Sequence, residues 1–549
     1  MRKRSVLILA VGLATILAGC SGSSGSTGNN GNSPDSSAAD NGGGKGGGKV
    51  QLTGIIVKNG LTKPLKEMEW LQKAEDDAGV EIKWQEISSD WSQKKGTLLA
   101  SGDIPDLIVG QGAISDADYA QFSGLFQDMT DLIQQYAPNV QTMFDEKPVT
   151  RTISTQPDGK IYGLPKYQRY WPGTGTRQYI NQQWLNKLGL QMPTNWDELY
   201  NVLEAFKKED ANGNGDPNDE IPMDFAPVGT GGFGFFQPTV LLGSTGITMS
   251  DDSFQGYFVE NGVVKNFVTD ERYKQMVEFL HKCYEAGLIN PEVFTQDYTK
   301  FQANGRGSGD TAKVGFTFGW GSSDRFGNVL PQQYASVPPL KVSADSDVQL
   351  SWSYDYNFMN YAGNMIEMSA KAKDKAAAMR FINELYNPTV SMQVLFGSIG
   401  PNIKDNGDGT YSVLPPQDPK MDPGTWKWTS TWGDAGPMYL ADSLNLSLPQ
   451  DMAEVLEEEQ PLRSVLDQID EDKDYYPGPF MKYSSTDINT LSLNDKNLMS
   501  IAMPKFAEWV TKGGIENGWD AYVKNCEKAG LPQNLTIMQQ YYDHYKTSK

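Results

Sequence analysis

Apolar and polar positions repeat with two different periods along residues 50–110. Val50–Lys58 has the composition of a strand, and residues 80–87 alternate apolar and polar positions as a half-buried strand does. Between them, Leu65–Gly79 has helical apolar spacing and a glycine at the C-cap position. Trp91–Gly110 predicts a helix, a tight turn and a short buried strand. This alternation of strand, helix and strand predicts an α/β fold with parallel strands.

Two later segments carry apolar stripes at helical spacing. In the first, Thr194 can cap a helix whose third position is Asp197, and one face of that helix carries Trp196, Leu199, Leu203 and Phe206. In the second, Ala377 and Phe381 are followed by either Glu384 or Leu385, and Asn387-Pro388 ends the helix. Such stripes are typical of a core, so we assign them no ligand role.

The N-terminus has the pattern of an export signal. Basic residues 2–4 precede an apolar run, Val6–Leu17, that is too short to span a bilayer but suits a signal peptide. The run ends in "LAGC", which resembles the lipobox of bacterial lipoproteins. This resemblance implies that residues 1–19 are removed and that Cys20 is lipidated. The alternative is an ordinary secretory signal that happens to end in cysteine.

Residues 21–49 are rich in Gly, Ser and Asn, which bury too little apolar surface to offset the entropy of ordering. We therefore predict that residues 20–49 form a flexible tether behind the lipidated cysteine. Residues 1–49 are excluded from the prediction of the fold.

Composition excludes several classes of function. With 47 Lys and Arg against 68 Asp and Glu, the net charge of −21 argues against nucleic-acid binding through a general basic face. Attachment to an anionic membrane likewise needs an anchor. Only two histidines, His281 and His544, are present, so a His-based zinc site or a Ser-His-Asp site is nearly excluded. Cys283 and Cys526 either form a disulfide or remain free thiols.

Several segments together resemble family 1 extracellular solute-binding proteins of ABC importers, the family that includes maltose-binding protein. The residues that carry this resemblance are "LLASGDIPDLIVG" (98–110), "YINQQWLNKLGLQMPTNWDEL" (179–199), "YEAGLINPEVF" (284–294) and "IEMSAKAKDKAAAMRFINELYN" (366–387). Residues 517–543 are similar to the C-terminal helices of the large lipoproteins that include alginate-oligosaccharide binders.

The resemblance implies an α/β, two-lobed periplasmic-binding-protein-like fold with a ligand cleft between the lobes and hinge strands. The crossover-like segments "RQYIN" and "VGFTFGW" predict that lobe 1 comprises 50–175 plus 315–372. Lobe 2 would then comprise 176–314 plus 373–549. The size of the chain favours a wide cleft and an oligosaccharide over a monosaccharide.

The loop Asp210–Pro222 has the first half of an EF-hand-type calcium loop. Counted from Asp210, oxygen-bearing side chains fall at positions 1, 3 and 5, a glycine follows at position 6, and Asp216 can add its backbone carbonyl. An oxygen-only set of this kind selects a hard cation such as Ca²⁺ over zinc or copper. The alternative is a polar turn with accidental acids.

The second half of the loop departs from the EF-hand pattern, because Ile221 occupies position 12 and Glu220 position 11. The loop resembles the calcium loop of alginate-binding-type solute-binding proteins, in which an Asp-Glu pair closes the cage. In this chain the pair would be Asp219-Glu220, one residue later than in the tightest form of the motif. This shift leaves open whether Asn218 or Asp219 takes the coordination position between Asp216 and Glu220. The predicted ligands of one structural Ca²⁺ are Asp210, Asn212, Asn214, Asp216, Asp219 and Glu220.

Aromatic residues gather where a cleft is expected, and a sugar needs flat aromatic platforms together with a few polar groups. The segment "FTFGWGSSDRF" resembles the family's return segment, in which a Gly-Trp faces the cleft, and this resemblance makes Trp320 the leading candidate. The other aromatic candidates for ligand contact are Trp171, Trp352, Trp428 and Trp432. The polar candidates are Gln111, Arg177, Asp324 and Asp355. Core or interdomain packing is the alternative for each aromatic residue.

The favoured hypothesis is a monomeric, extracytoplasmic, membrane-anchored protein that captures an oligosaccharide by lobe closure and delivers it to an ABC permease. It is not expected to be an enzyme or to bind nucleic acid. One alternative is a protein of the same fold that binds a peptide or a small metabolite. Another is a secreted glycoside hydrolase or lyase with two carboxylates across a cleft.

Overall fold

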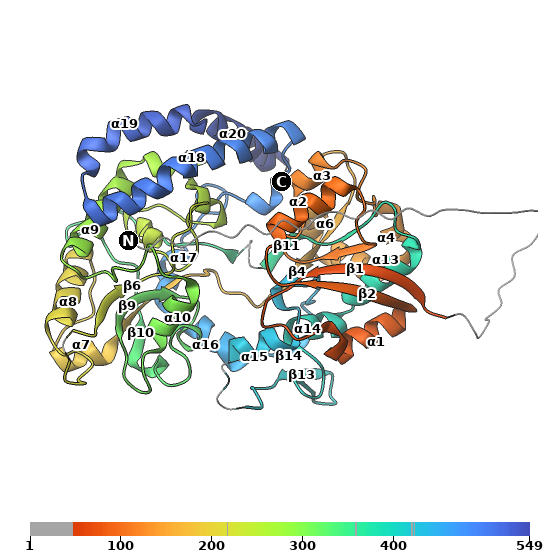
Figure 1. Cartoon of the computed structure of the whole chain (residues 1–549), viewed down its shortest axis with the longest axis horizontal. Helices are drawn as coiled ribbons and strands as arrows, with labels where there is room; N and C mark the ends of the chain where they lie inside the picture. The colour runs from red at the N-terminus through yellow and green to blue at the C-terminus, as the bar shows by residue number, and fades with distance from the viewer. Residues whose placement is uncertain (1–47, 217, 357–359, 419–420, 422, 549) are drawn as a thin grey trace, which may run out of the picture. The chain divides into compact units, whose positions relative to one another are not determined.

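The computed structural model describes residues 48–549 except 217, 357–359, 419–420, 422 and 549 (Figure 1). The chain divides into two compact units, residues 1–48 and 49–549, and every element given below belongs to the second. The predicted signal peptide, Cys20 and nearly all of the tether lie outside the described residues. None of the described helices has both the length and the apolar character required to cross a bilayer.

The first sheet has the strand order β2-β1-β3-β11-β4. Strand β1 (Val50–Val57) is parallel to β2 (Val80–Ile87) along its whole length and to β3 (Leu107–Val109) at its C-terminal end. Strand β11 (Tyr361–Met368) enters from much later in the chain and runs antiparallel to β3 and to β4 (Gly163–Tyr167). The predicted parallel strand–helix–strand unit of residues 50–110 is confirmed.

One hydrophobic core joins this sheet to its helices, and a smaller apolar cluster lies under α2 and α3. The apolar stripe of residues 375–385 belongs to this core through Ala377, Phe381 and Leu385, while Glu384 stays partly exposed. The helices are α1 (Glu69–Ala78), α2 (Trp91–Ser101), α3 (Asp116–Gln121), α4 (Thr130–Tyr136), α5 (Pro138–Glu146), α6 (Pro148–Ser154), α13 (Lys375–Leu385) and α14 (Pro388–Phe396).

The second sheet has the strand order β10-β5-β9-β6. Strand β9 (Val314–Gly319) lies between β5 (Arg177–Asn181), to which it is antiparallel, and β6 (Ile221–Asp224), to which it is parallel; β10 (Tyr334–Ser336) pairs with β5. A separate hydrophobic core packs against this sheet. Its helices include α7 (Gln182–Leu188), α8 (Trp196–Lys208), α9 (Glu271–Glu285), α10 (Tyr298–Arg306), α11 (Ser322–Phe326), α17 (Gln460–Leu466), α18 (Ser485–Lys512), α19 (Ile515–Lys528) and α20 (Leu531–Ser548).

Smaller elements complete the described chain. Strands β7 (Tyr257–Glu260) and β8 (Val263–Asn266) form a hairpin, and a three-stranded sheet contains β12 (Ile403–Asp405), β13 (Thr410–Val413) and β14 (Asn445–Ser447). Helices α15 (Pro423–Ser430) and α16 (Gln450–Glu458) follow, and α18, α19 and α20 pack on one another at the end of the chain (Figure 1).

The division of the chain between two lobes differs from the predicted boundaries. Residues 315–352 belong to the second lobe, because β9 and β10 pair in its sheet and Phe316 and Trp352 lie in its core. Residues 373–452 belong mainly to the first lobe, because α13 and α14 pack in its core. The chain therefore passes between the two cores through residues 168–176, again before β11, and a third time along α16 and α17.

Two local predictions also change. The cap of α8 is Asn195, whose side chain accepts from the backbone N–H of Glu198, while Thr194 instead donates to the Glu198 carboxylate. The predicted apolar face of α8 is confirmed, with all four of its residues buried. Cys283 and Cys526 are both free and buried.

Candidate functional site

A cavity of about 840 Å³ is lined by residues from both lobes. The second lobe contributes residues at the start of α11 and just after it, and the first lobe contributes α14 and α15, with α16 alongside. Its polar lining includes Ser322, Ser323, Asn328, Lys427, Glu454 and Glu458, and its apolar lining includes Phe396, Leu414 and Trp426. A site of this size, mostly apolar with a few polar groups, suits a small-molecule ligand.

An aromatic pair adjoins this cavity. The rings of Trp171 and Trp320 meet edge to face, with centroids 4.9 Å apart and an interplanar angle of 76°. The ammonium of Lys427, a residue of the cavity wall, lies 4.9 Å from the centroid of the Trp171 ring and 5.5 Å from that of Trp428. Both Trp171 and Trp320 are half-buried. The pair therefore lies next to the cavity wall without being part of its lining.

A second set of polar side chains follows the ends of the first-lobe strands. Lys166 Nζ donates to the carbonyl of Asp434 at 3.1 Å and to Gln111 Oε1 at 3.3 Å, and Gln168 donates to Asp434 Oδ1 at 3.2 Å. Lys427 Nζ lies 3.4 Å from Asp434 Oδ2. Burial lowers the pKa of Lys166 to about 8, although the Asp434 carboxylate opposes this shift. Burial alone would raise the pKa of Asp434, but Lys427 and Lys166 outweigh it and the pKa is lowered.

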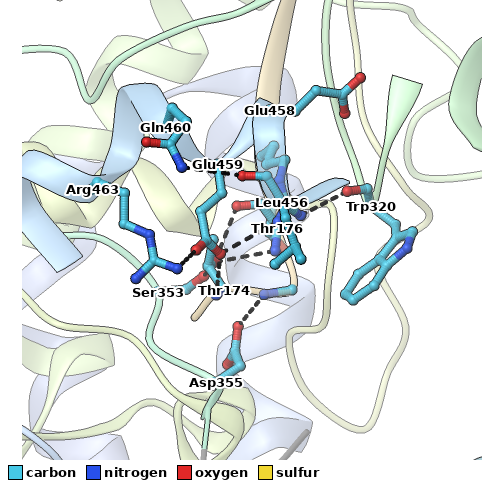
Figure 2. Close-up of polar contacts among 12 residues, drawn as sticks. Thr174, Thr176, Trp320, Ser353, Asp355, Leu456, Glu458, Glu459, Gln460 and Arg463 are labelled. Atoms are coloured by element: carbon cyan, nitrogen blue, oxygen red, sulfur yellow. Dashed lines mark hydrogen bonds and ion pairs between the residues drawn. The ribbon is translucent and has the colours of Figure 1, made fainter. Parts of the chain in front are cut away.

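A fully buried ion pair lies behind Trp320 (Figure 2). The Glu459 carboxylate accepts from Arg177 Nη2 at 3.4 Å and from the backbone N–H of Thr174 at 3.1 Å. Its other oxygen lies 2.6 Å from Arg463 Nη2. Arg177 Nη1 donates to the carbonyl of Trp320 at 2.7 Å. The residue that neutralises Glu459 therefore also holds the backbone of Trp320.

The segment before β11 joins the same group (Figure 2). Asp355 Oδ2 accepts from the backbone N–H of Gly175 at 2.8 Å, and the hydroxyls of Ser353 and Thr174 are 2.5 Å apart. Thus all three segments that connect the cores meet in one cluster of buried polar contacts, which we call the crossing node: Thr174, Gly175, Arg177, Ser353, Asp355 and Glu459.

The loop between α8 and β6 folds around its own carboxylates. Asp210 accepts from the backbone N–H groups of Gly213 and Gly215, and Asp219 accepts from the side-chain amides of Asn212 and Asn214. Burial raises the pKa of Glu220, whose Oε2 is buried without a hydrogen-bond partner. Over the described residues, no three His, Cys, Asp or Glu side chains are arranged to hold a metal ion by themselves. Any ion here needs Asn oxygens as well.

Comparison with known proteins agrees with this architecture. Residues 58–392 match the family model described as bacterial extracellular solute-binding protein. The chain belongs to this family. Its fold is the two-lobed solute-binding fold, with the ligand cleft between the lobes.

Two relatives of this solute-binding protein, one of them compared by sequence and by structure, illustrate the match. It is 30% identical over 501 residues, 87% of each chain, to FusA of Streptococcus pneumoniae, a fructooligosaccharide ABC transporter substrate-binding protein. A solved structure of an HMO-binding, ABC-transporter-associated solute-binding protein from Bifidobacterium longum infantis is 35% identical, with a TM-score of 0.83 and coverage of 91% and 99%. Structures of FusA with kestose and of its EF-hand mutant with fructo-nystose are 29% and 28% identical, have TM-scores of 0.79 and 0.80, and cover 91% of this chain and 100% of theirs.

The predicted ligand residues of this solute-binding protein separate into two groups. Lys427 lies over Trp171 and Trp428, and Trp320 packs on Trp171. Gln111 contacts Lys166, and Asp324 lies on α11 just beyond the cavity serines. Their contact with a ligand stays a prediction.

The second group has a packing or positioning role in place of the predicted ligand contact. Trp352 is fully buried and donates to the carbonyl of Thr176, and Trp432 is fully buried against Trp70 and Trp84. Arg177 and Asp355 are buried in the crossing node. Aromatic or charged identity alone does not separate a platform from a core residue.

Sequence reasoning missed several residues of the cavity. Ser322 and Ser323 follow the predicted Trp320 after one glycine, and Trp426 and Lys427 lie within the aromatic segment that contains the predicted Trp428 and Trp432. The sequence therefore identified the segment that lines the cavity, but it did not show which residues of that segment face the cavity. The sequence does not indicate that Glu458 lines a cavity, because this residue lies in an acidic run that resembles a solvated helix face.

The buried Asp355 carboxyl predicts a pH dependence of stability. Burial raises its pKa from 3.8 to about 6, although Gly175, Ser353 and Arg177 favour the charged form. A raised carboxyl pKa contributes stability that is complete below the unfolded pKa and is lost as pH rises through about 6. Asp355→Asn should therefore stabilise the protein relative to wild type more at pH 7 than at pH 4.5, by about 2 kcal/mol.

Thermal unfolding across this pH range checks the prediction. The matched control is Asp408→Asn, which alters an exposed turn carboxylate whose pKa is lowered by hydrogen bonds from Thr410. A constant difference between Asp355→Asn and wild type at all pH values would contradict the assignment.

Proposed function

We propose that this solute-binding protein is the lipid-anchored component of an ABC importer and that it captures an oligosaccharide by closing its two lobes. The observation that carries the proposal is the cavity lined from both lobes beside the Trp171–Trp320 pair. Aromatic faces with hydroxyl and amide groups between them match the alternating C–H and hydroxyl faces of a sugar. The importer and its permease are proposed from the family and from relatives such as FusA.

The charges around the cavity favour an uncharged sugar over a uronic acid. Lys166 and Lys427 both pair with Asp434, and Arg177 is committed to Glu459. Glu454 and Glu458 add negative charge to the cavity wall, where they accept hydrogen bonds from Ser323 and from the backbone of Ser322. A carboxylate-bearing sugar would have to displace an internal pairing or approach these acids, and both cost free energy.

The proposal also includes an anchor at Cys20, a monomeric extracytoplasmic body, and no catalytic step. The anchor rests on the "LAGC" sequence and on the Gly/Ser/Asn-rich segment that follows it. A membrane-tethered binder needs no turnover, because its task ends when closure presents the sugar to the permease.

Removing the aromatic platform tests the ligand assignment. Trp320→Ala should weaken binding of a neutral oligosaccharide by more than about 1 kcal/mol, because a stacked aromatic side chain is a typical hot spot. Calorimetric titration with a panel of neutral oligosaccharides that includes kestose, alongside oligogalacturonates, measures this. The bound sugar should be recovered intact.

The matched control is Trp509→Phe on α18, where Trp509 packs on Trp519 and Tyr522 and lies outside the cavity. Equal affinity in Trp320→Ala and wild type would reassign Trp320 to packing. Failure of every sugar in the panel to bind wild type would overturn the proposed function.

We further propose that the loop 210–220 holds one structural Ca²⁺. Asp219 and Glu220 both contact Asn212, Asp210 accepts from the backbone of Gly213 and Gly215 in the same loop, and Glu220 brings a buried oxygen without a partner. Asn212, Asn214 and Asp216 would supply the remaining oxygens that a hard cation requires. The ion would neutralise the mutual repulsion of these acids and fix the connection from α8 to β6.

Chelation tests the calcium proposal. A metal that binds only the folded state stabilises it by about 2.7 kcal/mol at a hundredfold excess over its Kd, so EGTA should lower Tm. Asp210→Ala should abolish this EGTA sensitivity. Asp408→Ala, which alters another exposed acidic turn, should retain it. Metal analysis that finds no calcium, together with a Tm indifferent to EGTA, would return the loop to a polar turn.

A further inference from the structure

We infer that Glu459 is a positioning residue for Trp320, which we call the ligand platform. Through Arg177, Glu459 fixes the position of Trp320. The same contacts couple the platform to the segments that connect the two lobes. This inference rests on the proposed function, because it concerns the same cleft. Glu459 itself is fully buried and is not among the cavity-lining residues.

The burial of this charge requires compensation. A carboxylate in the interior loses its hydration, and an ion pair regains that free energy only with good geometry and further hydrogen bonds. Glu459 accepts from the Thr174 backbone and lies 3.4 Å from Arg177 and 2.6 Å from Arg463, but its Oε1 and the Nε of Arg177 are buried without a hydrogen-bond partner, so the compensation is incomplete. An apolar residue of similar volume would fill the same space at lower cost. The charged residue is therefore explained better by what it orients than by the stability it adds.

The contact route from Glu459 to Trp320 is short. Arg177 donates from one nitrogen to Glu459 and from another to the Trp320 carbonyl, and its guanidinium carbon lies 5.5 Å from the centroid of the Trp320 ring. Arg177 is also the β5 partner of Gly319, the residue before Trp320. Any displacement of the guanidinium thus reaches both the backbone and the ring of Trp320.

The neighbouring Glu458 contacts the turn between β9 and α11 on the other side of Trp320. Its carboxylate accepts from the backbone N–H of Ser322 at 3.0 Å and from the Tyr179 hydroxyl at 2.7 Å. Two successive acids at the end of α16 therefore hold β5 and the β9–α11 turn on either side of Trp320. Because α16 is one of the connections between the lobes, its position and that of the platform are coupled.

The crossing node extends this coupling to the other two connections. Glu459 accepts from Thr174, Thr174 meets Ser353, and Gly175 donates to Asp355. A hinge motion that changes one connection must either carry the others with it or break a buried hydrogen bond, which is costly. Within the node, Arg177 contacts Trp320 directly, and Glu459 reaches Trp320 through Arg177.

The test combines Glu459→Gln with Trp320→Ala. Glutamine keeps the shape and an acceptor for the Thr174 N–H but loses the charge that holds Arg177. Glu459→Gln should weaken binding of the oligosaccharide that wild type takes by about tenfold, within the range of direct coupling energies. If Glu459 acts through Trp320, adding Glu459→Gln to Trp320→Ala should cost little more than Trp320→Ala alone.

The matched control is Asp224→Asn, which breaks the fully buried ion pair with Arg325 in the same lobe, at 3.2 Å. It should lower Tm as Glu459→Gln does yet leave the affinity within about twofold. Should Glu459→Gln fail to fold, Arg463→Gln, which removes the partly exposed partner of Glu459, replaces it. Fully additive losses in the double variant, or an unchanged affinity in Glu459→Gln, would overturn the inference.

A readout without ligand separates this inference from the proposed function. The emission of Trp320, taken as the difference between wild type and Trp320→Phe, should shift in Glu459→Gln and stay unchanged in Asp224→Asn. If no oligosaccharide binds wild type but this shift appears, the proposed function fails while the positioning role stands. An unshifted Trp320 emission in Glu459→Gln contradicts the positioning role.

Discussion

A buried carboxylate must find its partners inside the protein, and this requirement on Glu459 links parts of the chain that are far apart in sequence. Its partners are Thr174 on the first connection between the cores, Arg177 at the start of β5, and Arg463 on α17. Arg463 is local to Glu459, whereas Arg177 and Thr174 reach the carboxylate only when β5 and the preceding connection pack against the start of α17. The position of Trp320 is therefore linked to one set of buried polar contacts.

The rest of the architecture separates rigidity from recognition. Each lobe has its own sheet and hydrophobic core, and the cavity meets the first core at Phe396. The recognition residues stand instead where strands and short helices end: Trp320 after β9, Ser322 at the start of α11, and Lys427 on α15. Such positions can change their separation when the lobes move, while the sheets that carry them remain packed.

Local pattern sufficed for local structure but not for pairing between distant segments. The strand–helix–strand start and the α8 stripe follow from short-range spacing, whereas Trp320 is predicted near a cleft from the family resemblance of its segment. The lobe boundaries do not, because "VGFTFG" suits a strand in either sheet and only its pairing with β5 and β6 places it. Likewise, "EVLEEEQ" gives no hint that Glu459 is buried while Glu457 is exposed, since helical phase and packing decide this.

Closure of the two lobes around a sugar is the central claim, and a distance between labels tests it most directly. Cysteines at Asp77 on α1 and Lys208 on α8 are exposed positions, one in each lobe, and the native Cys283 and Cys526 are buried. The distance between spin labels at these two sites, measured with and without a saturating neutral oligosaccharide, should shorten to one narrower distribution when the sugar binds. An unchanged distance with the sugar demonstrably bound would contradict capture by closure.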